Sequence, residues 1–120
     1  MNPEELKRKS LTWLREVQEL DEDLCREIWS GYMEESRKNL AQVEAILQKS
    51  GDEEPLFDQL VGPIHTLKGN FANLGAEDGI GPLYIASQQW LAATRARQSD
   101  EFHRLRQEFL TLFHELESVE

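Results

Sequence analysis

The sequence predicts an all-α protein, an antiparallel up-down four-helix bundle with an additional N-terminal helix. Apolar residues recur at steps of three and four over most of the 120 residues, which is the period of amphipathic helices. The sustained alternation of apolar and polar residues that indicates strands is missing. The connections between the predicted helices are short, so neighbouring helices should run antiparallel. We expect a single domain over residues 1–120, with the N-terminal helix in 1–20 and the bundle in 21–120.

The first two helices have recognisable start signals. Asn2 is a capping residue followed by a proline and two acidic residues, so a helix should begin there and run to about Leu20. Asp21 opens a second, long helix that ends near Gly51. The apolar stripe predicted for this second helix consists of Leu24, Ile28, Tyr32, Leu40, Val43 and Leu47.

The third predicted helix covers about residues 53–74 and stops at Gly75. It contains Pro63, which has no N–H to donate to the carbonyl of Gln59. We therefore expect the helix to be kinked or interrupted at this position.

A loop over residues 76–81 leads to the last two helices. Pro82 should start the fourth helix, and residues 99–101 should cap the fifth. The apolar residues at helical spacing in these two helices are Leu83, Ala86, Trp90 and Ala93, followed by Phe102, Leu105, Phe109, Leu112, Phe113 and Leu116. We interpret Trp13, Trp29 and Trp90 as packing residues, and His103 and His114 as ordinary helix residues.

Charge and composition exclude several classes of function. The formal net charge is −10, so phosphate backbones and anionic membranes should repel the chain, and neither nucleic acid nor a membrane is expected as a partner. No apolar run approaches the roughly 20 residues that span a bilayer. The N-terminus lacks the pattern of a secretory signal. The single cysteine, Cys25, excludes an internal disulfide, and we expect a reduced thiol and a cytoplasmic location.

The segment GPIHTLKGNFANLG, residues 62–75, places a histidine among residues that weaken a helix. On a helical wheel His65 lies opposite an apolar stripe and should face solvent. That stripe consists of Leu56, Leu60, Leu67, Phe71 and Leu74, flanked by Ile64. Gly62, Gly69 and Ala72 lie within about 60° of His65, and Val61 is the one medium-sized neighbour. Each interior glycine costs about 1 kcal/mol relative to alanine, so we interpret this patch as a binding surface that leaves His65 accessible to another macromolecule.

The chemistry of this patch favours phosphoryl transfer. A neutral imidazole nitrogen is a competent nucleophile toward phosphorus. Lys68, one turn further along, can neutralise the charge that a phosphoryl group brings. We find no glycine-rich phosphate loop after a strand, no paired carboxylates around His65 and no metal-ligand cluster. We therefore expect a phosphocarrier without a metal or cofactor of its own, and not an enzyme.

His65-Thr66-Leu67-Lys68-Gly69, followed by Gly75, resembles the signature of histidine-containing phosphotransfer (HPt) domains, H-x-x-K-G-x(5)-G. The preceding stretch IWSGYMEESRKNLAQVEAIL is similar to the long helix that comes before the histidine helix in that family. The resemblance covers roughly residues 21–97. It implies a four-helix bundle in a two-component phosphorelay, with His65 phosphorylated, Lys68 supporting the phosphoryl group and Gly69 keeping the approach clear.

The resemblance also implies the partners. These would be the receiver domains of response regulators or hybrid histidine kinases, whose aspartate exchanges the phosphoryl group with His65. The receiver domain would supply Mg²⁺ and most of the catalytic groups, and the chain itself would be a monomer.

The chain departs from the family pattern in three places. The Gly62-Pro63 pair before the histidine is unusual, and the loop over residues 76–81 is longer and richer in glycine than expected. Family members often place a polar residue of the fourth helix near the histidine. Gln88 or Gln89 could have that role, although solvation of the surface is the simpler interpretation.

Two alternatives remain open from the sequence. The same fold and motif suit the phosphorylatable N-terminal module of a chemotaxis-type histidine kinase, which takes its phosphate from ATP through a separate kinase domain. The absence of a kinase domain from these 120 residues favours the stand-alone phosphocarrier. The second alternative is a non-catalytic bundle that docks signalling partners and for which the histidine is incidental.

Overall fold

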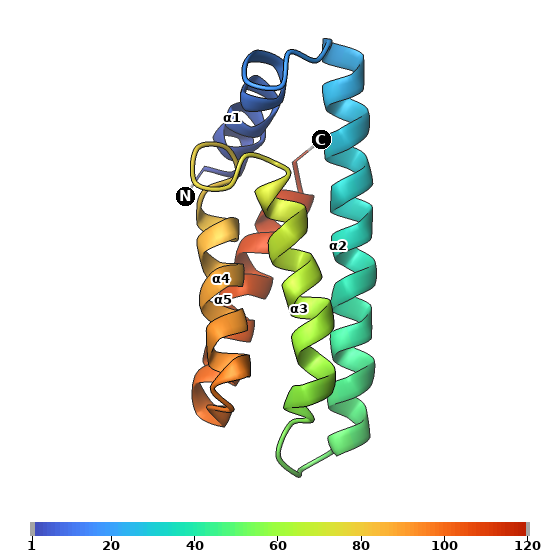
Figure 1. Cartoon of the computed structure of the whole chain (residues 1–120), viewed down its shortest axis with the longest axis vertical. Coiled ribbons are helices and arrows are strands. Elements are labelled where there is room, and N and C mark those ends of the chain that lie inside the picture. The colour runs from blue at the N-terminus through green and yellow to red at the C-terminus, as the bar shows by residue number, and fades with distance from the viewer. Residues whose placement is uncertain (1, 120) are drawn as a thin grey trace.

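The computed structural model describes residues 2–119, and these form five helices and no strand. The helices are α1 (Pro3–Glu16), α2 (Glu22–Ser50), α3 (Phe57–Ala72), α4 (Pro82–Arg95) and α5 (Ser99–Glu117). Figure 1 shows α2, α3, α4 and α5 extending along the long axis of the molecule, with α1 at one end. The molecule measures 47 × 23 × 22 Å along its principal axes.

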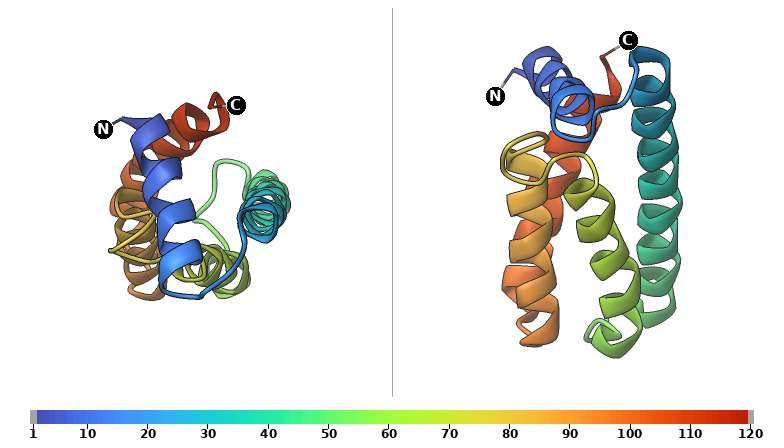
Figure 2. Two further views of the ribbon diagram at one scale, coloured as in Figure 1. Left: turned by 90° about the horizontal axis from the view of Figure 1, so that it is seen from above. Right: turned by 45° about the horizontal axis from the view of Figure 1, so that its top comes forward.

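Helix α3 lies between α2 and α4, and α4 also packs against α5. The view from above shows α1 crossing the end of the other helices, where it contacts α2 and α5 (Figure 2). Side chains bridge α2 and α5, since Arg37 pairs with Glu117 and Arg106 pairs with Glu44. All five helices contribute buried apolar residues to one core cluster, so each helix is held by its inner face.

Aromatic side chains connect α3, α4 and α5 at the centre of this core. The ring centroid of Phe109 lies 5.7 Å from that of Phe71 on α3 and 5.5 Å from that of Trp90 on α4. All three side chains are fully buried. Such contacts fix the rotation of α3 about its axis, and therefore fix which of its residues face solvent.

The end of α3 is held by α1. The buried hydroxyl of Ser10 donates a hydrogen bond of 2.7 Å to the carbonyl of Leu74. Gly75 follows with a φ of 107°, a conformation that side-chain-bearing residues rarely adopt. The ring of Trp13 lies against this glycine. The turn that ends the third helix is therefore clamped from the N-terminal helix.

Several predicted boundaries are confirmed. The side chain of Asn2 accepts hydrogen bonds from the backbone N–H groups of two first-turn residues of α1, and the Asp21 carboxylate accepts one of 2.8 Å from the N–H of Leu24. Gly51 follows the last residue of α2, and Pro82 is the first residue of α4. The expected turn between α3 and α4 covers residues 73–81, so α3 ends at Ala72, two residues before its predicted end.

The predicted ends of two helices are wrong. Helix α1 stops at Glu16 instead of Leu20, because the chain reverses toward α2 through Glu19, which has a φ of 56°. Helix α3 begins at Phe57 instead of residue 53. Pro55 accounts for the later start, since a proline disfavours the helical conformation of the residue before it.

Two details inside the helices also differ from the predictions. The interruption expected at Pro63 is absent, and α3 continues through it. Only the carbonyl of Gln59 loses its helical donor there. In α2 the predicted stripe is displaced near its start, because Leu24 is 39% exposed while Cys25 is buried. The buried residues of this helix are Cys25, Trp29, Met33, Ser36, Asn39, Leu40, Val43 and Ser50.

Candidate functional site

His65 lies near the middle of α3 and is exposed to solvent, as its place on the helical wheel predicts. The opposite side of the helix carries Leu60, Ile64, Leu67 and Phe71, all with no exposed surface. Burial of this stripe against α2 and α4 leaves the imidazole on the outer surface of the molecule. A partner can therefore reach the imidazole without any rearrangement of the core.

Lys68 lies one turn after His65 and is half-buried. Residues three apart on a helix are neighbours, with Cβ atoms about 5–6 Å apart. Within residues 2–119, the side chains of His65 and Lys68 make no hydrogen bond or ion pair with another side chain. The ammonium group is therefore free to pair with an incoming anion.

The neighbours of the imidazole leave open space around it. Gly62, Gly69 and Ala72 are exposed, and Val61 is half-buried. A Cβ atom built on Gly62 or Gly69 would meet no atom within 4 Å beyond the helix itself. No packing contact therefore requires a glycine at either position, and the surface beside His65 is free of side chains there.

A buried polar connection holds α3 against α2 behind this surface. The side-chain amide of Asn70 donates a hydrogen bond of 3.1 Å to the hydroxyl of Ser36, and that hydroxyl donates one of 2.7 Å to the carbonyl of Tyr32. Buried polar groups of this kind specify one register because a shifted register would leave them unpaired. Sequence reasoning did not identify this pair.

Apolar residues of the second helix were expected at the rim of this surface, but the sequence did not identify which ones. A shallow hollow beside the glycines is lined by Gln42, Ala45, Ile46, Gly62, Pro63 and Thr66. The antiparallel packing of α2 on α3, with Ser36 level with Asn70, brings residues near position 42 beside residues near position 64. The register, which the sequence does not reveal, was needed to find them.

The glutamines predicted as possible neighbours of the histidine lie on α4. Gln88 and Gln89 are both exposed, and neither side chain makes a hydrogen bond to His65 within the described part of the chain. The structure places them on the helix that flanks α3.

A larger hollow, of about 1090 Å³, lies between α1, the start of α2 and the end of α5. It is lined by charged side chains of both signs and contains neither His65 nor Lys68. The thiol of Cys25 in its lining is buried and donates its hydrogen bond to the backbone carbonyl of Leu20. The size of this hollow is therefore not a reason to move the candidate site away from α3.

Among residues 2–119, no three histidine, cysteine or acidic side chains gather in a way that could hold a metal ion. The same residues include no helix that is both long and apolar enough to cross a membrane. Comparisons with protein-family models, with curated proteins and with solved structures find no match to this chain. The chemistry of the site is therefore what indicates a function.

That chemistry is the acceptance of a small electrophilic group. The site offers an exposed nucleophilic ring, one uncommitted cation and a surface without obstruction. Neither a general base nor a carboxylate is hydrogen bonded to His65 within the described residues, so the side chains around the imidazole do not form an activating pair. A group transferred to His65 would have to be activated by the molecule that delivers it.

Proposed function

We propose that this chain is a histidine phosphotransfer protein of a two-component phosphorelay. In this proposal His65 accepts a phosphoryl group from the aspartate of a receiver domain and donates it to another. The observation that carries the proposal is the exposed His65 one turn before Lys68, whose ammonium group makes no ion pair within residues 2–119. Cβ atoms added to Gly62 and Gly69 beside it would have no atom of another element within 4 Å. Resemblance of this segment to the HPt signature supports the same reading.

The reaction needs little from this chain. A ring nitrogen of His65 attacks the phosphorus of an aspartyl phosphate, the N–P bond forms, and the P–O bond to the aspartate breaks to release its carboxylate. Lys68 offsets the charge of the phosphoryl oxygens once they lie beside the imidazole. Phosphoryl transfer depends mainly on positioning and charge stabilisation, so a receiver domain that brings Mg²⁺ and the remaining groups suffices.

The proposal includes the finer architecture and the setting. Helices α2–α5 form an antiparallel up-down four-helix bundle, and α1 covers one end of it. Packing of sequential helices α2–α3, α3–α4 and α4–α5 supports this arrangement, together with the short connections between them. The protein acts as a monomer in the cytoplasm, and its partners are the receiver domains of response regulators or hybrid histidine kinases.

A transfer assay tests the proposed function. The purified chain is incubated with a radiolabelled, phosphorylated receiver domain and Mg²⁺, and the label is followed by gel electrophoresis. We expect label on the chain within minutes, lost in acid and retained in alkali, as for a phosphoramidate bond. A panel of receiver domains that transfers no label would overturn the proposal.

Gly69→Leu should separate the role of this glycine in access from any role in stability. Leucine is a better helix former, and the position is open to solvent, so the free energy of unfolding should rise by about 0.5–1 kcal/mol. The same side chain would stand in front of the imidazole and displace an incoming phosphoryl group. Because misplacement of about 1 Å can cost 100-fold in rate, we expect transfer to fall by about that factor.

Gly31→Leu is the matched control for this variant. Gly31 is an exposed glycine of α2 at which an added Cβ also meets nothing within 4 Å. The control should gain similar stability in urea unfolding and transfer phosphate at the rate of the wild type. Equal transfer rates for the two leucine variants would contradict the interpretation of Gly69 as an access residue.

A further inference from the structure

The acidic residues of this chain are distributed very unevenly. Residues 59–99 contain two carboxylates, Glu77 and Asp78, and three cations. The remaining 79 residues contain 21 carboxylates and ten cations. The net charge of −10 therefore arises from α1, α2, α5 and the loop before α3, whereas residues 59–99, which include α4 and the part of α3 after Asp58, have a net charge of +1.

The structure brings the two low-acid helices side by side (Figure 1). We call the exposed side chains of residues 59–72 and 82–95 the carboxylate-free face. It contains His65 on α3 and, on the neighbouring helix, Gln88, Gln89 and the 41% exposed Ile85. The nearest carboxylate at the start of α3, Asp58, is paired with Arg97 at 2.5 Å.

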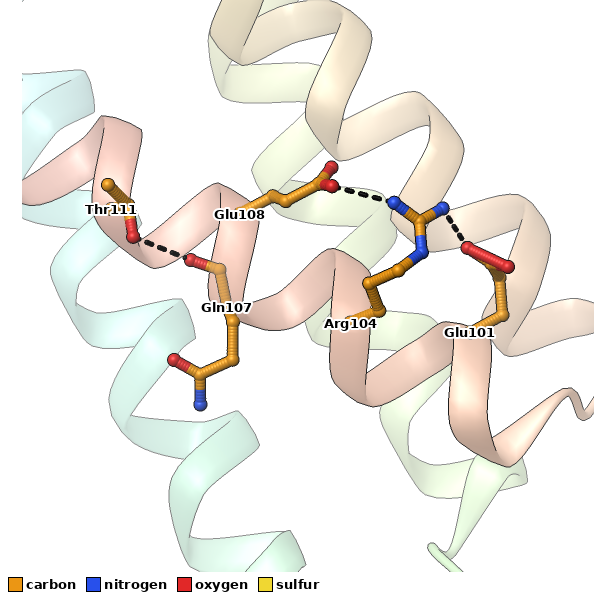
Figure 3. Close-up of polar contacts among 5 residues, drawn as sticks. All are labelled: Glu101, Arg104, Gln107, Glu108 and Thr111. Atoms are coloured by element: carbon orange, nitrogen blue, oxygen red, sulfur yellow. Dashed lines mark hydrogen bonds and ion pairs between the residues drawn. The ribbon is translucent and has the colours of Figure 1, made fainter.

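The opposite side of the molecule has a different character. On α5, Arg104 is hydrogen bonded to both Glu101 and Glu108, and Figure 3 shows the guanidinium group held between the two carboxylates. Charges of both signs also alternate along α2, where Arg26 pairs with Glu22. Exposed carboxylates are thus present on α1, α2 and α5 and on the first turn of α3. The rest of α3 and the whole of α4 have none.

Local charges, and not the total charge, decide what can dock on a given face. The Debye length is about 8 Å at physiological ionic strength, so carboxylates on the far side of the molecule are screened from a partner in contact with α3 and α4. A partner whose contact surface is acidic would meet like charges on α1, α2 or α5, but not on this face. Like charges on the other faces disfavour wrong orientations of such a partner. Their absence from this face speeds productive encounter.

We infer that the carboxylate-free face is the docking surface for a protein whose own contact surface bears carboxylates, and that the footprint extends from His65 across α4. This inference rests on the proposed function, because it concerns the partner of the same site. It assigns Gln88 and Gln89 to the binding surface because they are exposed and carry no charge. Charge complementarity comes from the cations of this face, Lys68 and Arg95, together with its lack of carboxylates.

Near-isosteric changes from glutamine to glutamate test the inference. Gln89→Glu adds one carboxylate to the face, and Gln107→Glu adds one to α5, whose Cα atoms all lie more than 8 Å from those of α3. The Gln107 side chain is exposed and makes no contact with the residues drawn around it in Figure 3. Both variants should fold, because both positions are on the surface.

The measurement is the second-order rate constant of phosphoryl transfer with a phosphorylated receiver domain at low and at high salt. We expect Gln89→Glu to lower the rate constant about 3- to 10-fold at low salt, with the loss shrinking as salt is raised. Gln107→Glu should stay within about twofold of the wild type. Gln89→Lys removes the same amide with the opposite charge, and it should match or exceed the wild-type rate.

The other possible outcomes distinguish a failure of the docking inference from a failure of the proposed function. If the wild type transfers phosphate but Gln89→Glu and Gln107→Glu behave alike, the inference is overturned and the proposed function stands. A faster Gln89→Glu would indicate a cationic partner surface and would also overturn it. The inference would also be overturned if the wild type sedimented as a dimer and Gln89→Glu as a monomer, because a second copy of the chain would then occupy the face. A wild type that neither receiver domains nor phosphoramidate can phosphorylate removes the proposed function itself.

Discussion

His65→Gln should abolish phosphoryl uptake from a phosphorylated receiver domain while leaving the fold intact. Glutamine has no nucleophilic ring nitrogen, so the N–P bond cannot form, and no side chain within the described residues is placed to replace the imidazole. The side chain is exposed and has no hydrogen-bond partner there, so the free energy of unfolding should change by less than about 0.5 kcal/mol. Radiolabel transfer and urea unfolding of the same preparation measure the two effects.

The chain contains two matched controls for this variant. His103 and His114 are exposed histidines of α5, so His103→Gln and His114→Gln remove the same chemistry from a different helix. Both should accept label at the wild-type rate. If His65→Gln retained acid-labile label and either control lost it, the site would lie on α5 and not on α3.

The sequence was sufficient to predict the side of α3 on which His65 lies. Leu60, Leu67 and Phe71, the members of the predicted stripe that lie within α3, have no exposed surface, because α2 and α4 pack on both of its flanks. The period of the pattern therefore determines the exposed side without knowledge of the partner helices. Gln88 and Gln89 could not be placed in the same way, since their distance from His65 depends on the register between α3 and α4.

Errors in the predicted fold arose where tertiary contacts outweigh local signals. Residues 17–20 contain no glycine or proline, so no local signal marks the end of α1 at Glu16. The chain leaves the helix there because α1 crosses the end of the other helices and must turn to reach α2 (Figure 2). Along α2, α1 contacts the start and α3 packs along the length, so no single straight stripe describes its buried side.

The glycines of this chain illustrate the same distinction between local and tertiary causes. Gly62 and Gly69 lie in regular helix, and additional atoms there would enter solvent. Gly75 and Gly79 lie in the turn after α3, where their backbones approach each other closely. The sequence predicts Gly62 and Gly69 inside the helix, Gly75 at its end and Gly79 in a loop, but it does not show which of the four meet other atoms. Their physical roles are opposite, since the first pair lowers stability and the second pair permits a close contact.

Gly79→Ala should destabilise the protein by about 3 kcal/mol. A Cβ atom at this position would lie 2.7 Å from the Cα of Gly75 and even closer to the carbonyl oxygen of Leu74. Both contacts are with backbone atoms, which cannot rotate away as a side chain could. Relief would require movement of the Leu74 carbonyl, and that carbonyl is the acceptor of the hydrogen bond from the buried Ser10. The loss should appear as a lower urea midpoint in equilibrium unfolding.

Gly31→Ala provides the comparison, because it adds the same methyl group where nothing lies within 4 Å. This change should raise the free energy of unfolding by up to about 1 kcal/mol, as expected for alanine in an exposed helix interior. The φ angle of Gly79 is not positive, so a loss at this position measures the steric contact alone. An unfolding free energy for Gly79→Ala within about 0.5 kcal/mol of the wild type would mean that the turn can open, and that α1 does not clamp the end of the histidine helix.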